Sequence, residues 1–515
     1  MRSRRNFSLS SLRRLSQLFF VILFLILFRK TDYAGTDQLP YAVNIFFRLD
    51  PLVAASVMLG AEVIITLVLY SVIVVFLTLL FGRFFCGWVC PLGSLLDLCH
   101  GLIPQQKKGS RGRFKSWKYL LLTLILTFAF FGLPLVGYFD PFSILVRSMT
   151  IVLDPFLYWI VSTPFDFLYK VAPGWITKAS ELIYAQLKQF ILPYNQKVYT
   201  LTSMSLIIFL LIFALEKVER RFWCRNLCPL GGLLALLSRF SFLRGYIQET
   251  CNDCQSCNKV CRMEAIDSQM RIIPEDCNLC LDCRDLCLNK SVSFKFKRPS
   301  EKLPSLGVSR RAFVGTLFAG IILPAFFKVR ADTKMANPSL IRPPGAINER
   351  KFLNRCIRCG GCMKVCPTNA LHPSLFEAGA EGIFAPRLIP RIGFCEFNCT
   401  LCGQVCPTGA INRLVLKEKQ KTVIGTTYFD KNRCLPYAKG IPCIVCEEHC
   451  PTPDKAIKLR EAQVFNPEGK TVTIKQPYLI DRFCIGCGIC ENKCPVEGTA
   501  AVIVLKKSEK VNLPF

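Results

Sequence analysis

The chain has 515 residues, with 65 Lys and Arg against 36 Asp and Glu, and with 29 cysteines beside only three histidines. Hydrophobic residues make up 51% and the mean hydropathy is +0.35, which excludes a disordered chain and indicates that part of the protein lies in lipid. The net charge of +29 therefore gives no reason to expect a nucleic-acid partner, and three histidines exclude numerous mixed Cys–His zinc sites.

Four apolar runs in the first half of the chain predict membrane-spanning helices. They are residues 15–28, 53–81, 119–139 and 201–215. About 20 apolar residues cross a hydrocarbon core roughly 30 Å thick. Seven basic residues in the loop 83–118, and four more just after the last run, place these loops on the cytoplasmic side with the N-terminus. The sequence thus predicts a multi-pass protein of a bacterial inner membrane, with 140–200 outside and the aromatic stretch 155–169 at the interface.

A motif is repeated within this half of the chain. Residues 83–93 and 221–231 share the pattern R-F-aromatic-C-x3-C-P-L-G, and each copy closes one predicted helical hairpin. Because the two hairpins run in the same direction, a parallel repeat would bring the two loops together. Their cysteines are Cys86, Cys90, Cys224 and Cys228. Converging thiols predict an extra cluster or a redox-active thiol site, and the alternative is that they only pack. Cys99 fits no pattern and is expected to be a small buried residue.

Six cysteine quartets account for all 24 cysteines after residue 250. Four have the spacing C-x2-C-x2-C-x3-C, while two begin with an x3 or an x8 interval. The quartets are Cys251, Cys254, Cys257 and Cys261; Cys277, Cys280, Cys283 and Cys287; Cys356, Cys359, Cys362 and Cys366; Cys395, Cys399, Cys402 and Cys406; Cys434, Cys443, Cys446 and Cys450; and Cys484, Cys487, Cys490 and Cys494. Three thiolates on a tight loop hold three corners of a cubane, and the fourth cysteine reaches the neighbouring cluster. Disulfide frameworks and zinc sites do not need this repeat, so the sequence predicts six [4Fe–4S] clusters.

These patterns predict a multi-domain fold, in which an α-helical membrane bundle of four spanning helices and a predicted fifth carries α+β ferredoxin-like domains. Residues 1–250 form the membrane domain, 251–298 a two-cluster ferredoxin unit, 299–350 a linker, and 351–515 a four-cluster ferredoxin domain. In the two-cluster unit, we expect Cys287 to complete the site of Cys251, Cys254 and Cys257. Cys261 would complete the site of Cys277, Cys280 and Cys283.

The linker carries an export-like signal. Ser309-Arg310-Arg311-Ala312-Phe313 resembles a twin-arginine signal, and the apolar run 312–327 after it predicts the fifth spanning helix. A plain positive-inside flank is the alternative interpretation, and Val329-Arg330-Ala331 would allow cleavage after Ala331. Export would place 351–515 in the periplasm, while 251–298 stays on the cytoplasmic side.

Motifs for other cofactors are absent from the sequence. It has no C-x-x-C-H, G-x-G-x-x-G or Walker A pattern, so we expect no haem, flavin or nucleotide site. Quinol oxidation would also need a carboxylate that accepts protons. Asp50, Asp140 and Asp154 each precede a proline near the predicted outer face, and the ordinary explanation is that each caps a helix. No catalytic or quinone-site residue can be named from the sequence.

Together these motifs carry a family resemblance. The doubled C-x3-C-P, followed by a two-cluster unit, resembles NapH-type membrane ferredoxin proteins. The twin-arginine segment, followed by four ferredoxin motifs, resembles NapG-type periplasmic ferredoxins and their MauM relatives in methylamine utilisation. The resemblance implies a fusion of the two that relays electrons from the quinol pool to a periplasmic reductase system, as an accessory quinol dehydrogenase with redox partner proteins. The alternative is an assembly or maturation factor that reduces a metal or cofactor for another enzyme.

The resemblance to four-cluster ferredoxin subunits also implies which quartets pair. Outer quartets would pair with each other, so that Cys494 joins Cys356, Cys359 and Cys362, while Cys366 joins Cys484, Cys487 and Cys490. Inner quartets would do the same, so that Cys450 joins Cys395, Cys399 and Cys402, while Cys406 joins Cys434, Cys443 and Cys446. The enlarged interval between Cys434 and Cys443 is either a partner-binding loop or a tolerated insertion.

Overall fold

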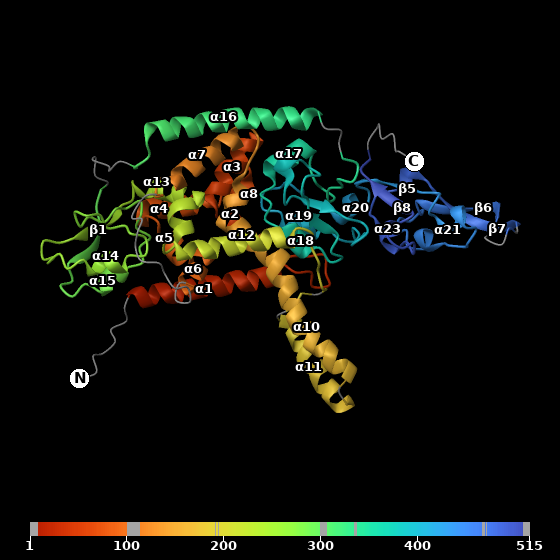
Figure 1. Cartoon of the computed structure of the whole chain (residues 1–515), viewed down its shortest axis with the longest axis horizontal. Coiled ribbons are helices and arrows are strands. Elements are labelled where there is room, and N and C mark those ends of the chain that lie inside the picture. Colours follow the sequence, from red (N-terminus) through yellow and green to blue (C-terminus); the bar gives the residue numbers. More distant parts are fainter. Residues whose placement is uncertain are drawn as a thin grey trace. The chain divides into compact units, whose positions relative to one another are not determined.

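A computed structural model describes residues 9–99, 114–171, 173–190, 192–193, 195–298, 306–333, 337–465, 469 and 471–507. The chain folds as two compact units, each built from three stretches of sequence (Figure 1). Unit 1 comprises Met1–Phe28, Val43–Ser148 and Ser203–Lys328, and unit 2 comprises Arg29–Ala42, Met149–Thr202 and Val329–Phe515. The two-cluster segment 251–298 therefore belongs to the same unit as most of the apolar helices.

Unit 1 is mainly helical. Its helices are α1 (Leu9–Lys30, which ends in unit 2), α2 (Ile45–Arg48), α3 (Pro51–Ala61), α4 (Ser71–Phe81), α5 (Phe84–Trp88), α6 (Pro91–Cys99), α7 (Trp117–Phe130), α8 (Val136–Phe139), α9 (Pro141–Ser148), α12 (Thr202–Ala214), α13 (Pro229–Ser238), α14 (Ser256–Val260), α15 (Asp282–Asp285) and α16 (Arg310–Thr333, which also ends in unit 2). Strands β1 (Leu243–Ile247) and β2 (Val292–Phe296) pair antiparallel, with Leu243 opposite Phe296, and join the two ends of the two-cluster segment.

The helices of unit 1 approach one another closely where they carry glycine. Helix α13 packs against α3, α4 and α7. A Cβ atom on Gly232 of α13 would lie 2.9 Å from the carbonyl oxygen of Lys118, so only glycine fits at that crossing. A Cβ atom on Gly320 of α16 would meet the side chain of Thr127 in α7. Small residues thus set the spacing of the bundle, as they do in lipid-embedded helix pairs.

Helix length supports fewer spans than the sequence predicts. Among the described residues, two helical stretches are long and apolar enough to cross a membrane, Leu9–Lys30 and Pro141–Val171. The predicted span 53–81 is interrupted after α3, where Glu62 adopts a left-handed conformation with φ 54°. The predicted spans 119–139 and 201–215 appear as the shorter helices α7 and α12. The stretch 155–169, predicted to be interfacial, lies inside the longer of the two candidate spans.

Helix α16 contains the predicted fifth span and the residues around it. Arg310 and Arg311 of the twin-arginine pattern are exposed in its first turn. The three residues Val329 to Ala331, which would form the cleavage site, continue the same helix. This helix is not one of the two candidate spans found among the described residues.

Unit 2 combines helices with three small antiparallel strand pairs. Its helices are α10 (Asp154–Val171), α11 (Gly174–Phe190), α17 (Glu349–Arg355), α18 (Gly361–Val365), α19 (Leu401–Val405), α20 (Leu416–Lys419), α21 (Leu435–Ala438), α22 (Val445–Glu448) and α23 (Ile489–Lys493). Its strands are β3 (Leu371–Pro373), β4 (Pro386–Leu388), β5 (Thr426–Phe429), β6 (Ile457–Phe465), β7 (Thr471–Leu479) and β8 (Val502–Leu505). They pair as β3–β4, β5–β8 and β6–β7, and Ile341 adds a bridge to Leu388.

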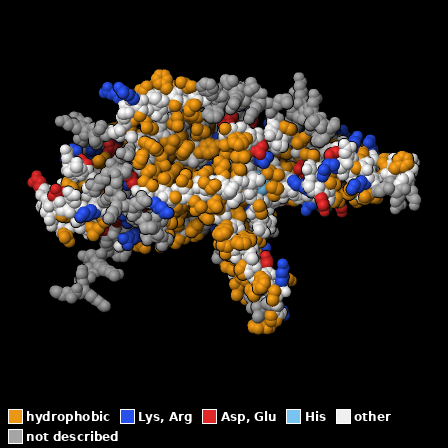
Figure 2. All heavy atoms as spheres, viewed as in Figure 1, with side chains coloured by type: hydrophobic (Ala, Val, Ile, Leu, Met, Phe, Trp, Pro, Cys, Tyr) orange, Lys and Arg blue, Asp and Glu red, His pale blue; other side chains and the backbone are white. Residues whose placement is uncertain are grey.

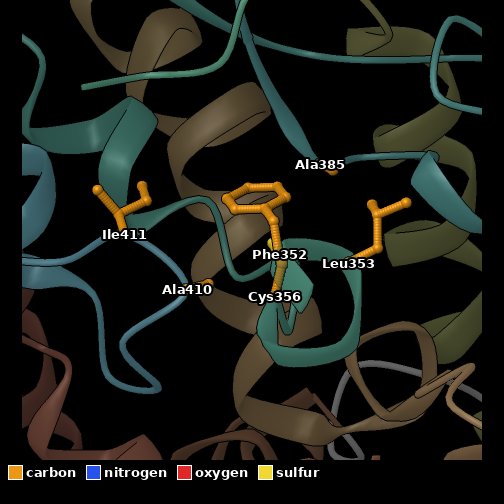
Figure 3. Close-up of a cluster of buried hydrophobic side chains, with 6 residues drawn as sticks. All are labelled: Phe352, Leu353, Cys356, Ala385, Ala410 and Ile411. Atoms are coloured by element: carbon orange, nitrogen blue, oxygen red, sulfur yellow. The ribbon is translucent and has the colours of Figure 1, made fainter. Parts of the chain in front are cut away.

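The ferredoxin part of unit 2 has a small apolar core next to its first cysteine. Phe352 and Leu353 of α17 lie against Ala385, Ala410 and Ile411, and Cys356 belongs to the same buried group (Figure 3). Phe352 is fully buried. The core therefore holds the first cysteine of this domain in place.

A buried network of charges ties the ferredoxin part of unit 2 to the two stretches from the N-terminal half of the chain. Lys364, on α18, is fully buried and pairs with both Asp32 and Asp154. Arg29 also pairs with Asp154, at 2.6 Å, and Lys197 pairs with Asp32, at 3.1 Å. Two carboxylates and three cations thus satisfy one another, which buried charges require.

We predict that Asp154→Asn destabilises unit 2, because it leaves Lys364 and Arg29 with one carboxylate fewer in a buried site. The loss should be roughly 3 kcal/mol, or a fall of roughly 5–10 °C in the thermal midpoint of the purified full-length protein. Asp166→Asn, an exposed position on the same helix, is the matched control and should leave the midpoint unchanged. Equal midpoints for the two variants would contradict the anchoring role.

Candidate iron–sulfur sites

The later quartets of unit 2 form four cysteine groups, each completed by a cysteine from its nearest neighbour in sequence. One cavity is lined by Cys395, Cys399, Cys402 and Cys366, and a second by Cys484, Cys487, Cys490 and Cys450. A third is lined by Cys434, Cys443, Cys446 and Cys494. The fourth group consists of Cys356, Cys359 and Cys362. The thiol of Cys406 interacts electrostatically with all three of them, so Cys406 completes this group.

The predicted outer-with-outer and inner-with-inner pairing is therefore wrong. Cys494 joins the 434 quartet instead of the 356 quartet, and Cys366 joins the 395 quartet instead of the 484 quartet. The physical reason is helix packing. Helix α18 packs against α19 and α22 packs against α23, so each helix delivers its terminal cysteine to its immediate partner.

The two halves of this domain meet through their cysteine loops. The backbone N–H of Cys395 donates to the carbonyl of Cys487 at 2.8 Å. This bond joins the 395 site directly to the 484 site. The four cysteine groups of unit 2 thus form an unbroken series, from the 356 site beside the buried charges to the 434 site beside α21.

The two-cluster segment of unit 1 has the grouping that its spacing predicts. Cys277, Cys280, Cys283 and Cys261 line one cavity. Cys257 and Cys287 belong to one buried cluster of side chains, and Cys251 and Cys254 are the thiols whose charge acts on Cys257. Helices α14 and α15 pack together. Cys261, which follows α14, therefore reaches the Cys277 site, and Cys287, which follows α15, reaches the Cys251 site.

The chemistry of these groups fits [4Fe–4S] clusters. Burial raises the pKa of Cys359 and of Cys395 to about 12, so these thiols need bound iron to stay deprotonated. The fourth cysteine of a quartet repeatedly accepts a backbone N–H, as Cys261 does from Ala265 at 3.2 Å and Cys450 does from Ala456 at 3.3 Å. All 29 cysteines are free of disulfides. Among the described residues, no group of Cys, His, Asp or Glu is arranged for a single metal ion.

The four cysteines of the repeated C-x3-C-P motif also converge. Cys90 interacts electrostatically with Cys224 and Cys86. Cys228 does so with Cys224, Cys86 and Cys90. Burial raises the pKa of Cys224 to about 12 and that of Cys228 well above its usual range. Cys90 and Cys228 each precede a helix that begins with proline, and Cys228 Sγ accepts the N–H of Gly231 at 3.3 Å. We call Cys86, Cys90, Cys224 and Cys228 the four-cysteine site.

Two buried arginines face the four-cysteine site in a reciprocal arrangement. Arg221, from the second loop, donates to the carbonyls of Cys86 at 3.1 Å and Gly93 at 3.0 Å in the first loop. Arg83, from the first loop, lies 3.0 Å from where a Cβ atom of Gly231 would stand. Both guanidinium groups are fully buried. Two helix N-termini and two arginines make the site strongly attractive to an anion, as a thiolate-ligated cluster is.

Arg221 is itself held in place by an acidic side chain, and Arg83 donates to the backbone carbonyl of Glu275 at 2.8 Å. Asp97 pairs with Arg221 at 2.7 Å and with Arg262 of the two-cluster segment at 2.9 Å. Although burial disfavours its charge, these guanidinium groups hold the pKa of Asp97 well below its usual range. The sequence interpretation did not assign Arg83, Arg221 or Asp97 to the site. The sequence does contain a signal for Arg83 and Arg221, because an arginine begins both copies of the repeat.

The four-cysteine site lies directly against the two-cluster segment. A Cβ atom on Gly87, next to Cys86, would stand 2.2 Å from the carbonyl oxygen of Asn278, next to Cys277. Trp88 Nε1 donates to the carbonyl of Leu279 at 3.0 Å. The two cysteine loops are therefore in backbone contact, which only glycine at position 87 permits. Cys99, at the end of α6, is half-buried rather than buried and forms no part of either group.

Comparisons with protein families define the class of protein. A 4Fe-4S binding domain matches residues 63–110, 201–246 and 402–423, and a 4Fe-4S dicluster domain matches residues 355–410. The dicluster match includes the 356 and 395 quartets together, in agreement with their pairing in the structure. The protein is thus a ferredoxin-type iron–sulfur electron-transfer protein.

Relatives narrow this class to a family. The methylamine utilization ferredoxin-type protein MauM of Methylorubrum extorquens is 36% identical over 195 residues, which are 37% of this chain and 83% of MauM. The ferredoxin-type protein NapG of Escherichia coli (strain K12) is 33% identical over 180 residues, which are 34% of this chain and 75% of NapG. NapG of Haemophilus influenzae is 32% identical over 225 residues. The chain belongs to this family of MauM and NapG ferredoxin-type proteins. No solved structure matches it.

Proposed function

We propose that the protein is a membrane-bound polyferredoxin, built like a NapH-type protein joined to a NapG-type protein, that passes electrons from the quinol pool to a redox partner in the periplasm. Six [4Fe–4S] clusters in the ferredoxin quartets and a seventh in the four-cysteine site would supply one-electron transfer. All 24 quartet cysteines and the four cysteines of the membrane motif would be ligands.

The observation that carries this proposal is the backbone contact between neighbouring cysteine loops. In unit 1, Gly87 touches Asn278, so the four-cysteine site adjoins the Cys277 site. In unit 2, Cys395 bonds to Cys487, so four cysteine groups follow one another without a break. Series of adjacent sites serve electron relay, whereas a scaffold that only stores iron has no need of them.

Exposed apolar side chains favour a membrane location for the helices. The side chains of Leu18, Phe19 and Ile26 in α1 are each more than half exposed, and so are those of Ile207 and Leu211 in α12. Orange side chains gather over the helices of unit 1 and over the α10–α11 hairpin (Figure 2). Apolar surface of this extent needs lipid or a protein partner to cover it.

The sides proposed for the two ferredoxin parts follow from the sequence. Seven basic residues in the loop 83–118, and four more after residue 215, favour the cytoplasmic side for these loops and for 251–298. The twin-arginine pattern at Ser309 to Phe313, followed by the apolar run 312–327, favours export of 351–515 to the periplasm.

Reporter fusions test this topology. We expect a reporter that is active only outside the cytoplasm to be active when joined after Phe515, and to be inactive when it replaces the chain after Arg298. A cytoplasm-only reporter that is active after Phe515 would contradict the proposal. Expression of both fusions, compared by immunoblot, is the control.

Quinol oxidation can be tested on the purified full-length protein. Adding decylubiquinol under anaerobic conditions should bleach the visible absorbance of the clusters. In Cys86→Ala/Cys224→Ala the bleaching should be slower by about tenfold or more, because electrons lose their first acceptor. Cys99→Ala, a cysteine outside every group, should behave as wild type. Wild-type protein that dithionite reduces but quinol does not would contradict quinol oxidation and favour the maturation-factor alternative.

A further inference from the structure

Two buried aspartates of unit 1 cap neighbouring helices. Asp50 Oδ1 accepts the N–H groups of Leu52 at 2.8 Å and Val53 at 3.1 Å, at the start of α3. Asp140 Oδ2 accepts the N–H of Ser143 at 2.7 Å, at the start of α9. The capping role expected for these two residues is confirmed, whereas Asp154 pairs with Arg29 and Lys364 instead. Capping uses one oxygen of each carboxyl group.

The second oxygen of each carboxyl group is not used for capping. Asp50 and Asp140 are 0% exposed, and the charge of Asp140 acts on Asp50. Asp50 Oδ2 and Asp140 Oδ1 receive no N–H or O–H from any described residue. Two neighbouring ionised carboxylates repel each other, and burial disfavours both charges, so the pair favours holding one proton.

The charge around the pair fits a single shared proton. Arg147 of α9 is the cation that acts on Asp140, and its Nη1 donates to the carbonyl of Gly137 at 2.9 Å. Burial, the charge of Asp140 and the two capping N–H groups act on Asp50. One cation and one remaining negative charge balance each other, whereas two ionised carboxylates in the same dry site would not.

An aromatic contact links this pair to the four-cysteine site. Phe142, two residues after Asp140, lies with its ring centroid 6.0 Å from that of Phe85, which precedes Cys86. Both rings are buried. A buried aromatic contact thus joins the segment that carries Asp140 to the loop that carries Cys86, and charges interact more strongly across apolar side chains than across water.

We propose that Asp50 and Asp140 are the proton-accepting site that accompanies electron entry at the four-cysteine site. The proposal rests on the proposed quinol oxidation. Oxidation of a quinol releases two electrons and two protons. A [4Fe–4S] cluster held by the four-cysteine site would be the one-electron oxidant, and as each O–H bond of the quinol breaks, its proton would form an O–H bond on the carboxylate of the pair, which passes from one proton to two. The pair would release this proton when the electron moves on to the adjoining two-cluster segment, and the second electron and proton would then follow the same course.

The three capping bonds keep this exchange local. Asp50 Oδ1 and Asp140 Oδ2 stay bonded to the helix N-termini, and only Asp50 Oδ2 and Asp140 Oδ1 change protonation. Asparagine is also a good helix cap, so Asp50→Asn and Asp140→Asn should fold while losing the site for the second proton. These variants therefore separate proton uptake from structural support.

Redox-difference infrared spectroscopy on the full-length protein tests the proposal. On reduction, wild type should gain the C=O stretch of a newly protonated carboxyl group, and this band should shift in heavy water. The band should vanish in Asp50→Asn and in Asp140→Asn. It should remain in Asp481→Asn, a control carboxylate that hydrogen bonds to Thr426 in unit 2. Cluster reduction is followed in the same samples by electron paramagnetic resonance.

Each result bears on one claim. Wild-type clusters that reduce normally without any carboxyl band would overturn the proton site and leave electron relay standing. A band that persists in both asparagine variants would overturn it as well. Loss of the band in Cys86→Ala/Cys224→Ala, with the other clusters still reduced, would support coupling to the four-cysteine site. If quinol fails to reduce wild type, dithionite reduction still reports on the carboxyl pair, so the two proposals fail separately.

Discussion

Burial of thiols in groups of four is the constraint on which the rest of this structure depends. An isolated thiolate is unstable in a dry site, as the raised pKa of Cys224, Cys359 and Cys395 indicates. Each group therefore needs iron, and it needs cations and N–H donors around the anionic cluster. A [4Fe–4S] unit with four thiolates carries about −2, so seven of them would lower the formal charge from +29 to roughly +15. Much of the basic excess then serves the clusters and the membrane flanks.

The same constraint explains how the cysteine loops are arranged. A quartet completes its group with a cysteine from a second segment, so two helices must pack before either site exists. In unit 2 this happens between sequence neighbours, α18 with α19 and α22 with α23. In the repeated C-x3-C-P motif it happens between the two copies, with Arg83 and Arg221 reaching across to the opposite loop. Gly93 and Gly231 leave room for these arginines, because a Cβ atom would stand 3.5 Å from Arg221 at position 93 and 3.0 Å from Arg83 at position 231.

The sequence was sufficient to predict which cysteines matter but not which of them meet. Spacing alone gives the six quartets, because local loop geometry is encoded in the intervals. It also predicts the meeting of the two membrane loops, since the repeated motif implies a symmetry. The order of quartets in unit 2 could not be obtained in this way, because both pairings satisfy the same intervals. Among the described residues, two helical stretches are long and apolar enough to span a membrane, and hydropathy alone does not reveal an interruption such as that at Glu62.

Contacts between polar groups that are far apart in the sequence were the hardest to predict. Asp50 and Asp140 are each explained by a local capping rule, and the effect of one charge on the other becomes evident only in three dimensions. Asp97 is an ordinary helix residue in the sequence, yet it joins Arg221 of the second loop to Arg262 of the two-cluster segment. This long-range contact connects the four-cysteine site to the two-cluster segment.

The most direct test of this account is the iron and acid-labile sulfide content of the anaerobically purified full-length protein, compared with Cys86→Ala/Cys224→Ala and with Cys99→Ala. Seven clusters predict about 28 iron atoms per chain in wild type and in Cys99→Ala, and about 24 in the double variant. Equal iron in wild type and the double variant, at about 24, would show that the four-cysteine site holds no cluster and would contradict the account.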